Sequence, residues 1–211
     1  MKRAEPLNVI WWLVSRASGI VALVLISATV LLGLAMATRM LRRPATKRVS
    51  AQLHEHLALV AIAAIAVHGA ALLGDHWLKP GWRGITIPFA LNYRPAFTGI
   101  GIIAGYLAAL LGPSFYLRRR IGMRRWRSLH RLTVVVWALS AAHALGAGTD
   151  APRLWLRAVA LAPAVPVVYL LVLRLARRPS SKSARRGADE RRPVTGKRLA
   201  ADVASTARAR R

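Results

Sequence analysis

The stretch LHRLTVVVWALSAAH, residues Leu129–His143, is largely apolar and carries His130 and His143 thirteen residues apart. An α-helix rises ~1.5 Å per residue, so the two imidazoles would lie ~20 Å apart along one helix. The hydrocarbon core of a bilayer is ~30 Å thick, so both would lie inside it, one near each face. Ionisable side chains inside a membrane are costly and usually mark a functional site. The stretch therefore predicts a membrane helix with sites at two depths.

A second apolar segment, LHEHLALVAIAAIAVHGAALLG, repeats this arrangement with His54 and His68 fourteen residues apart. Two such helices, parallel and side by side, would present two histidine pairs. Bis-histidine ligation of two b-type haems uses this pattern. A single membrane histidine is more often a hydrogen-bond partner between helices, but two pairs of nearly equal spacing are much harder to explain in that way.

The spacings also carry a geometric difficulty. Fourteen residues return to within about 40° of the same helix face, whereas thirteen miss it by about 140°. Either the two haems approach the helix that carries His130 and His143 from different azimuths, or that helix is tilted. His56 lies two residues from His54, about 200° around the helix, so we do not expect it to be a ligand.

The whole chain combines high hydrophobicity with high charge. Of its 211 residues 55% are hydrophobic, and the formal net charge is +26. The two populations are segregated along the chain, which is typical of a membrane protein with basic loops. A nucleic-acid-binding protein would share the charge but not the apolar segments, so no nucleic acid partner is expected. The absence of cysteine excludes disulfides, cysteine-ligated clusters and covalently attached haem.

Five apolar segments predict an all-α membrane bundle of about five transmembrane helices, with membrane lipid around it. Their ranges are Val9–Ala37, Leu53–Leu73, Pro95–Tyr116, Leu129–Leu145 and Leu154–Leu175. The haem sites would lie between the second and fourth helices. Two prolines, Pro163 and Pro166, predict a kink in the fifth.

Lys and Arg residues predict the orientation, because cytoplasmic loops carry an excess of them. Most lie in the tail and in the loops after the first and third helices. Those in the two loops are Arg39, Arg42, Arg43, Lys47, Arg48, Arg118, Arg119, Arg120, Arg124, Arg125 and Arg127. We therefore expect a multi-pass protein of the cell (inner) membrane, with its N-terminus outside and its C-terminus cytoplasmic. His54 and His130 would form the inner pair, and His68 and His143 the outer pair.

Other residues are candidates for contacts with a cofactor. Gly19 and Gly33, fourteen residues apart on the first helix, match the histidine spacing and would leave room for a flat group, although small residues also pack membrane helices generally. The third helix has a similar series, Gly99, Gly101, Gly105 and Gly112.

Two arginines, Arg16 and Arg94, would suit haem propionates. Trp137, midway between His130 and His143, is expected chiefly to fill space.

With these residues in view, the chain resembles the bacterial ferric-reductase-like transmembrane family. The family includes the membrane haem subunit of the methionine-sulfoxide-reductase system and the membrane half of NADPH oxidases. The resemblance covers about residues 11–175 and rests on SRASGIVALVLISATVLLGL, LHEHLALVAIAAIAVHG, YRPAFTGIGIIAG and IGMRRWRSLHRLTVVVWALSAAHALGAGTD. It implies one or two b-type haems, with His54, His68, His130 and His143 as iron ligands. We expect residues 1–176 to form this domain and residues 177–211 a basic, disordered cytoplasmic tail.

The resemblance also implies partners. Family members that reduce metal or oxygen directly often carry a flavin and nicotinamide module, but the 177–211 tail is too short for one and no Gly-rich dinucleotide fingerprint is present. We therefore expect no flavin or NAD(P) site in this chain. Electrons would enter from a separate flavin reductase or quinol and leave to an acceptor protein or small acceptor at the outer face.

The sequence leaves two alternatives to a two-haem electron-transfer protein open. The chain would be a single-haem electron-transfer subunit if only one histidine pair binds haem. It would be a non-redox membrane protein, in transport or assembly, if the histidines only link helices.

Overall fold

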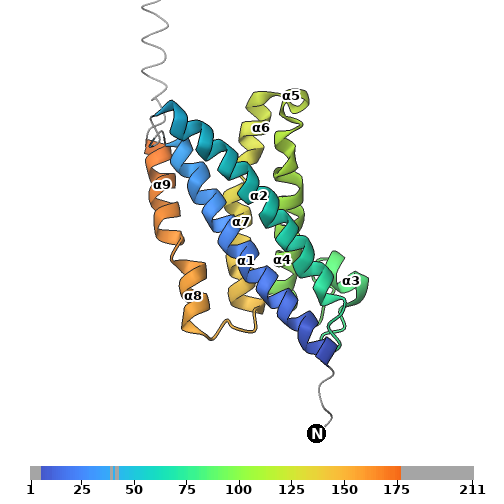
Figure 1. Cartoon of the computed structure of the whole chain (residues 1–211). Helices are drawn as coiled ribbons and strands as arrows, with labels where there is room; N and C mark the ends of the chain where they lie inside the picture. Colours follow the sequence, from blue (N-terminus) through green and yellow to red (C-terminus); the bar gives the residue numbers. More distant parts are fainter. Residues whose placement is uncertain (1–5, 39, 41–42, 177–211) are drawn as a thin grey trace, which may run out of the picture. The chain divides into compact units, whose positions relative to one another are not determined.

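The computed structural model describes residues 6–38, 40 and 43–176, and this part of the chain is built from helices joined by turns (Figure 1). The elements are α1 (Pro6–Ala37), α2 (Pro44–Leu72), α3 (Gly81–Thr86), α4 (Pro95–Leu111), the 3₁₀ helix η1 (Pro113–Phe115), α5 (Arg118–Ile121), α6 (Met123–His130), α7 (Thr133–Ala147), α8 (Leu154–Leu161) and α9 (Ala164–Ala176). The predicted all-α class is confirmed. The expected basic tail, residues 177–211, lies outside the described residues.

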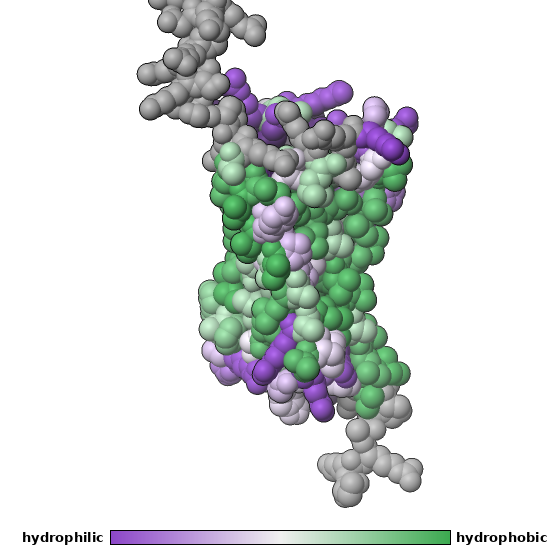
Figure 2. All heavy atoms as spheres, turned by 90° about the vertical axis from the view of Figure 1, so that its left-hand side faces the viewer, coloured by the Kyte–Doolittle hydropathy of each residue, from purple (hydrophilic) through white to green (hydrophobic). Residues whose placement is uncertain are grey.

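Four segments of the described chain are long and apolar enough to cross a membrane. They are Val9–Ala37, Pro44–Leu72, Pro95–Phe115 and Leu154–Ala176. Each overlaps one of the five segments predicted from the sequence, so the chain is a multi-pass membrane protein. Figure 2 shows the corresponding surface, on which an apolar band separates two hydrophilic ends.

The fifth prediction, one continuous spanning helix over Leu129–Leu145, is wrong. α6 ends at His130 and α7 begins at Thr133, and the fifteen residues of α7 span only ~22 Å. The junction is a short 3₁₀-like turn, in which the Leu132 N–H donates to the Leu129 carbonyl at 2.9 Å. The Thr133 hydroxyl caps the His130 carbonyl at 2.8 Å.

This junction also bears on the spacing of the two histidines. A 3₁₀ turn rotates ~120° per residue instead of ~100°, so three such residues add ~60° between His130 and His143. The added rotation removes part of the azimuth gap of about 140° that a regular helix would leave.

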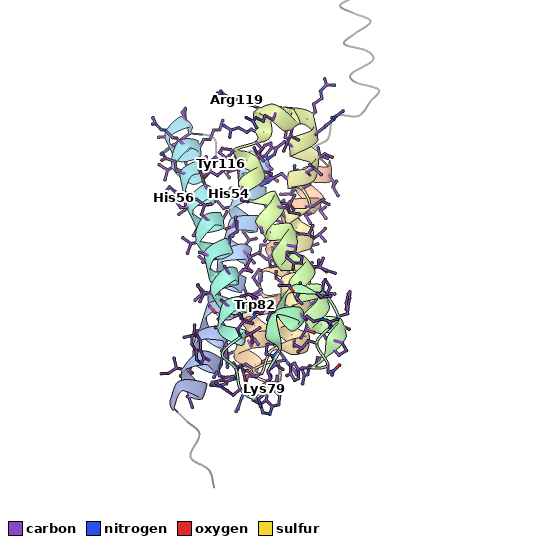
Figure 3. All side chains as sticks on the ribbon, turned by 90° about the vertical axis from the view of Figure 1, so that its right-hand side faces the viewer. His54, His56, Lys79, Trp82, Tyr116 and Arg119 are labelled. Carbon is purple, nitrogen blue, oxygen red and sulfur yellow. The ribbon has the colours of Figure 1, made fainter. Side chains whose placement is uncertain are left out.

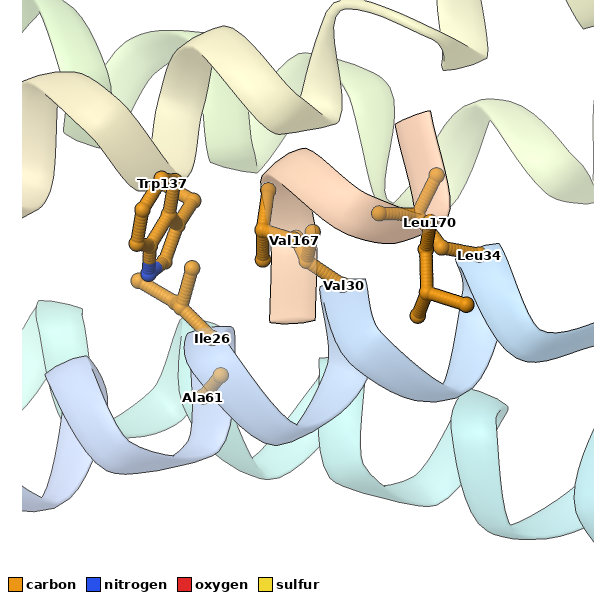
Figure 4. Close-up of a cluster of buried hydrophobic side chains, with 7 residues drawn as sticks. All are labelled: Ile26, Val30, Leu34, Ala61, Trp137, Val167 and Leu170. Carbon is orange, nitrogen blue, oxygen red and sulfur yellow. The ribbon is translucent and has the colours of Figure 1, made fainter. Parts of the chain in front are cut away.

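α1 is the central helix of the bundle. It packs along α2 and against α7, and α7 in turn packs against α4 and α8. The short connection between α1 and α2 makes them antiparallel neighbours. Their buried side chains meet those of α7 and α9 in a core formed by Ile26, Val30, Leu34, Ala61, Trp137, Val167 and Leu170 (Figure 4).

Trp137 lies within this core. Its side chain is 8% exposed, and its indole Nε1–H donates to the Ser27 hydroxyl at 3.1 Å. A buried indole with a satisfied N–H packs stably between helices. The space-filling interpretation of Trp137 therefore agrees with its surroundings.

The predicted kink in the last span is present as a break. α8 ends at Leu161 and α9 begins at Ala164 (Figure 1). Pro163 lies at the break and Pro166 in the first turn of α9, and neither has a backbone N–H to continue the ladder of helical hydrogen bonds.

The two ends of the bundle differ in charge. α5 and α6 lie at one end, which we call the arginine-rich end after Arg118, Arg119, Arg120, Arg124, Arg125 and Arg127. α3, α8 and the start of α4 lie at the other, which we call the α3 end (Figure 1). Between them, apolar side chains such as Leu110 and Val165 are 69% and 76% exposed, as expected for a surface that faces lipid.

Candidate functional site: two facing histidine pairs

The bundle brings the four histidines together as two pairs. His54 on α2 faces His130 at the end of α6, with ring centroids 6.0 Å apart and ring planes at 72°. His68 on α2 faces His143 on α7, with centroids 6.1 Å apart and planes at 77°. The first pair lies toward the arginine-rich end and the second toward the α3 end. Both have nearly the same geometry, although they are built from different helices.

Three of the four imidazoles are oriented by a backbone carbonyl. The Nδ1 atom of His68 lies 2.8 Å from the Ser15 carbonyl oxygen, and that of His54 lies 3.0 Å from the Thr29 carbonyl oxygen. His143 Nδ1 lies 2.9 Å from the Phe97 carbonyl oxygen. A carbonyl oxygen can only accept, so each Nδ1 carries the proton and donates it. Each Nε2 is then left with a lone pair, which is the state that binds a metal.

A glycine lies four residues after each of these carbonyls: Gly19 after Ser15, Gly33 after Thr29 and Gly101 after Phe97. In a helix the side chain four residues on lies over the preceding turn and would cover the carbonyl there. Glycine leaves it open.

A Cβ at Gly19 would lie 2.9 Å from His68 Nδ1, and one at Gly33 would lie 3.0 Å from His54 Cε1. A Cβ at Gly101 would overlap the His143 ring. These glycines therefore make room for the imidazoles themselves, whereas the sequence predicted room for a flat cofactor. Gly101 belongs to the glycine series noted on the third helix, but its contact with an imidazole was not predicted.

His130 is held differently. Its Nδ1 is buried and has no hydrogen-bond partner among the described residues, and the same holds for Nε1 of Trp126. The two rings stack, with centroids 5.0 Å apart and planes at 23°. Trp126 precedes His130 by one helical turn on α6, so the indole covers the imidazole from the side of its own helix.

His56 points away from the pair formed by its neighbour. Its side chain is exposed, and its Nδ1 lies 2.7 Å from the Gln52 carbonyl oxygen of the preceding turn (Figure 3). Glu55, between the two histidines, accepts a hydrogen bond from the Tyr116 hydroxyl at 2.6 Å. This bond ties α2 to the segment after α4 and raises the pKa of Tyr116.

Arg16 already has an anionic partner. Its guanidinium makes two hydrogen bonds to the Asp150 carboxylate, one of them 2.9 Å from Nη2 to Oδ1, and lies over the Trp12 ring. From the sequence we expected a haem propionate as the anionic partner of this arginine; in the structure the Asp150 carboxylate takes that place. Arg94 donates from Nη1 to the Gly146 carbonyl at 2.6 Å, one turn beyond His143.

The described residues contain no cluster of three or more His, Cys, Asp or Glu side chains able to hold a metal ion. Each pair offers only two nitrogen donors that face each other. Two such donors suit a metal whose remaining positions are already filled, as they are in a haem.

These features define a helical membrane protein with paired histidines inside the bundle. Residues 18–141 match the family described as the ferric reductase like transmembrane component. Because this match covers more than half of the sequence, the chain belongs to that family, as the resemblance indicated. The match includes His54, His68 and His130 and ends two residues before His143.

Membership implies haem-mediated electron transfer across a membrane in general, with electron donors and acceptors as partners. The comparisons with curated proteins and with solved structures gave no match.

Proposed function

We propose that this protein relays electrons across the membrane through two b-type haems, one held by His54 and His130 and the other by His68 and His143. The facing geometry of the rings is the main support. A metal–imidazole bond is about 2 Å long and the ligating nitrogen lies ~1.1 Å from the ring centroid, so two imidazoles on one iron have centroids ~6.2 Å apart. The observed separations of 6.0 and 6.1 Å agree with this value.

The chain's own residues would position and tune the haems, which supply the one-electron chemistry of iron. The carbonyls of Ser15, Thr29 and Phe97 fix the tautomer and the plane of three imidazoles. The apolar core that includes Trp137 would keep water away from the haems. The two pairs lie ~20 Å apart along α2, so together they carry an electron through most of the apolar band.

The arginine-rich end is proposed to face the cytoplasm, since cytoplasmic loops are enriched in Lys and Arg. On this orientation His54 and His130 form the inner site. A flavin reductase or a quinol would deliver electrons there, and an acceptor protein or small acceptor would take them from the His68–His143 site at the α3 end.

A fusion experiment tests the orientation. A reporter fused after Arg211 should be active only if it is a type that works in the cytoplasm. A reporter fused to a chain truncated after Lys79, which lies at the α3 end, should be active only if it is a type that works in the periplasm. The opposite pattern at both positions would reverse the inner and outer sites.

The colour of the purified protein tests the function itself. After reduction with dithionite, the full chain should show the α-band of a b-type cytochrome, and the band should be split if the two sites differ. A colourless protein, purified from cells supplied with haem, would contradict the proposal and favour the non-redox alternative, in which the histidines only link helices.

A further inference from the structure

The four imidazoles are not held alike, and the difference has a consequence for the redox potentials. His54, His68 and His143 each donate from Nδ1 to a carbonyl, at 3.0, 2.8 and 2.9 Å. His130 has no acceptor for its buried Nδ1 among the described residues, and the Trp126 indole stacks on it instead. One site thus has two hydrogen-bonded imidazoles and the other has one.

A hydrogen bond from Nδ1 increases the basicity of the imidazole, because it moves negative charge toward Nε2. A more basic ligand stabilises ferric over ferrous iron, so it lowers the midpoint potential; second-shell hydrogen bonding is one of the main ways in which a protein sets this potential.

On the basis of the proposed function, we propose that Trp126 is a positioning residue: it holds His130 by stacking and offers the imidazole Nδ1 no hydrogen-bond acceptor. The haem at the His54–His130 site therefore has the higher midpoint potential of the two. An electron that enters at the arginine-rich end then rests at this site. Transfer to the His68–His143 site is uphill and is completed only when an acceptor removes the electron there.

The test is a spectroelectrochemical titration of the full chain with its haems bound. His68→Ala leaves only the His54–His130 haem and His54→Ala leaves only the other, which assigns the two waves. We expect the His68→Ala protein to have the higher midpoint potential of the two. The reverse order would overturn the proposal. Failure of the proposed function would look different, because the wild type would then bind no haem or a single haem and two waves could not be resolved.

Substitutions at Trp126 test the cause. Trp126→Gln places an amide oxygen one turn before His130, where it can accept from Nδ1, whereas Trp126→Leu removes the stacking ring without adding an acceptor. Trp126→Phe keeps an aromatic ring over the imidazole. We expect the His54–His130 haem to titrate at a lower potential in Trp126→Gln than in Trp126→Leu, and near the wild-type value in Trp126→Phe. The His68–His143 wave should not move in any of them.

Equal potentials in the Gln and Leu variants would contradict the role of the missing hydrogen bond. If either variant fails to accumulate, the order of the potentials in His68→Ala and His54→Ala decides the proposal by itself.

Discussion

Replacing His68 by alanine is expected to remove one of the two haems and to leave the spectrum of the other unchanged. His68 and His143 face each other at 6.1 Å, while His54 and His130 form a separate pair fourteen residues away along α2. In the proposed two-haem arrangement, each iron would depend on both imidazoles of its own pair. His54→Ala should remove the other haem in the same way. The measurement is haem bound per folded polypeptide, because an emptied site leaves a cavity and some variants will accumulate poorly.

Double substitutions sharpen this expectation. His68→Ala with His143→Ala should cost little more haem than either change alone, because one imidazole holds the iron weakly. His54→Ala with His143→Ala should empty both sites. His56→Ala is the matched control and should keep its full haem content, since its side chain is exposed. If His54→Ala and His68→Ala each removed all the haem and gave the same spectrum, the two-site account would be wrong.

Adding a single methyl group at Gly101 is expected to disable the His68–His143 site almost as completely as removing a histidine. The new Cβ would overlap the His143 ring, and the ring would have to leave the Phe97 carbonyl to which it donates at 2.9 Å. Gly101→Ala should therefore lose most of the haem at this site and keep the other. Gly19→Ala should have the same effect in weaker form, because its Cβ would lie 2.9 Å from His68 Nδ1.

Gly69→Ala is the control for both changes. Gly69 is adjacent to His68 on the same helix, but a Cβ there would meet nothing within 4 Å. It tests the general effect of an added methyl group on α2 without disturbing an imidazole. A Gly101→Ala protein with full haem content and an unchanged spectrum would show that the open carbonyl is not needed to hold His143.

Much of the site followed from spacing along the chain. The histidines of α2 are fourteen residues apart, and each faces the histidine of the α6–α7 segment that was expected at its depth. Periodicity and apolar length were sufficient for this, because they are local properties. The break after His130 was not predicted, since nothing in LHRLTVVVW marks a helix end as glycine or proline would.

The partners that orient the site could not be predicted, because they are backbone atoms or come from distant parts of the sequence. The Phe97 carbonyl on α4 accepts a hydrogen bond from His143 on α7, and Asp150 accepts hydrogen bonds from Arg16, 134 residues earlier in the chain. Sequence patterns identify the residue that needs a partner but not which helix supplies it. The stacking of Trp126 on His130 could have been predicted, since the two residues are one helical turn apart on α6.

A pyridine-haemochrome assay on the purified full chain, combined with quantitative amino-acid analysis of the same sample, shows whether each chain binds two haems. It gives the number of b-type haems per polypeptide without assumptions about donor, acceptor or orientation. Two facing histidine pairs of nearly identical geometry predict two haems per chain. One haem per chain in a fully loaded sample would mean that only one pair binds iron, and none would contradict the account altogether.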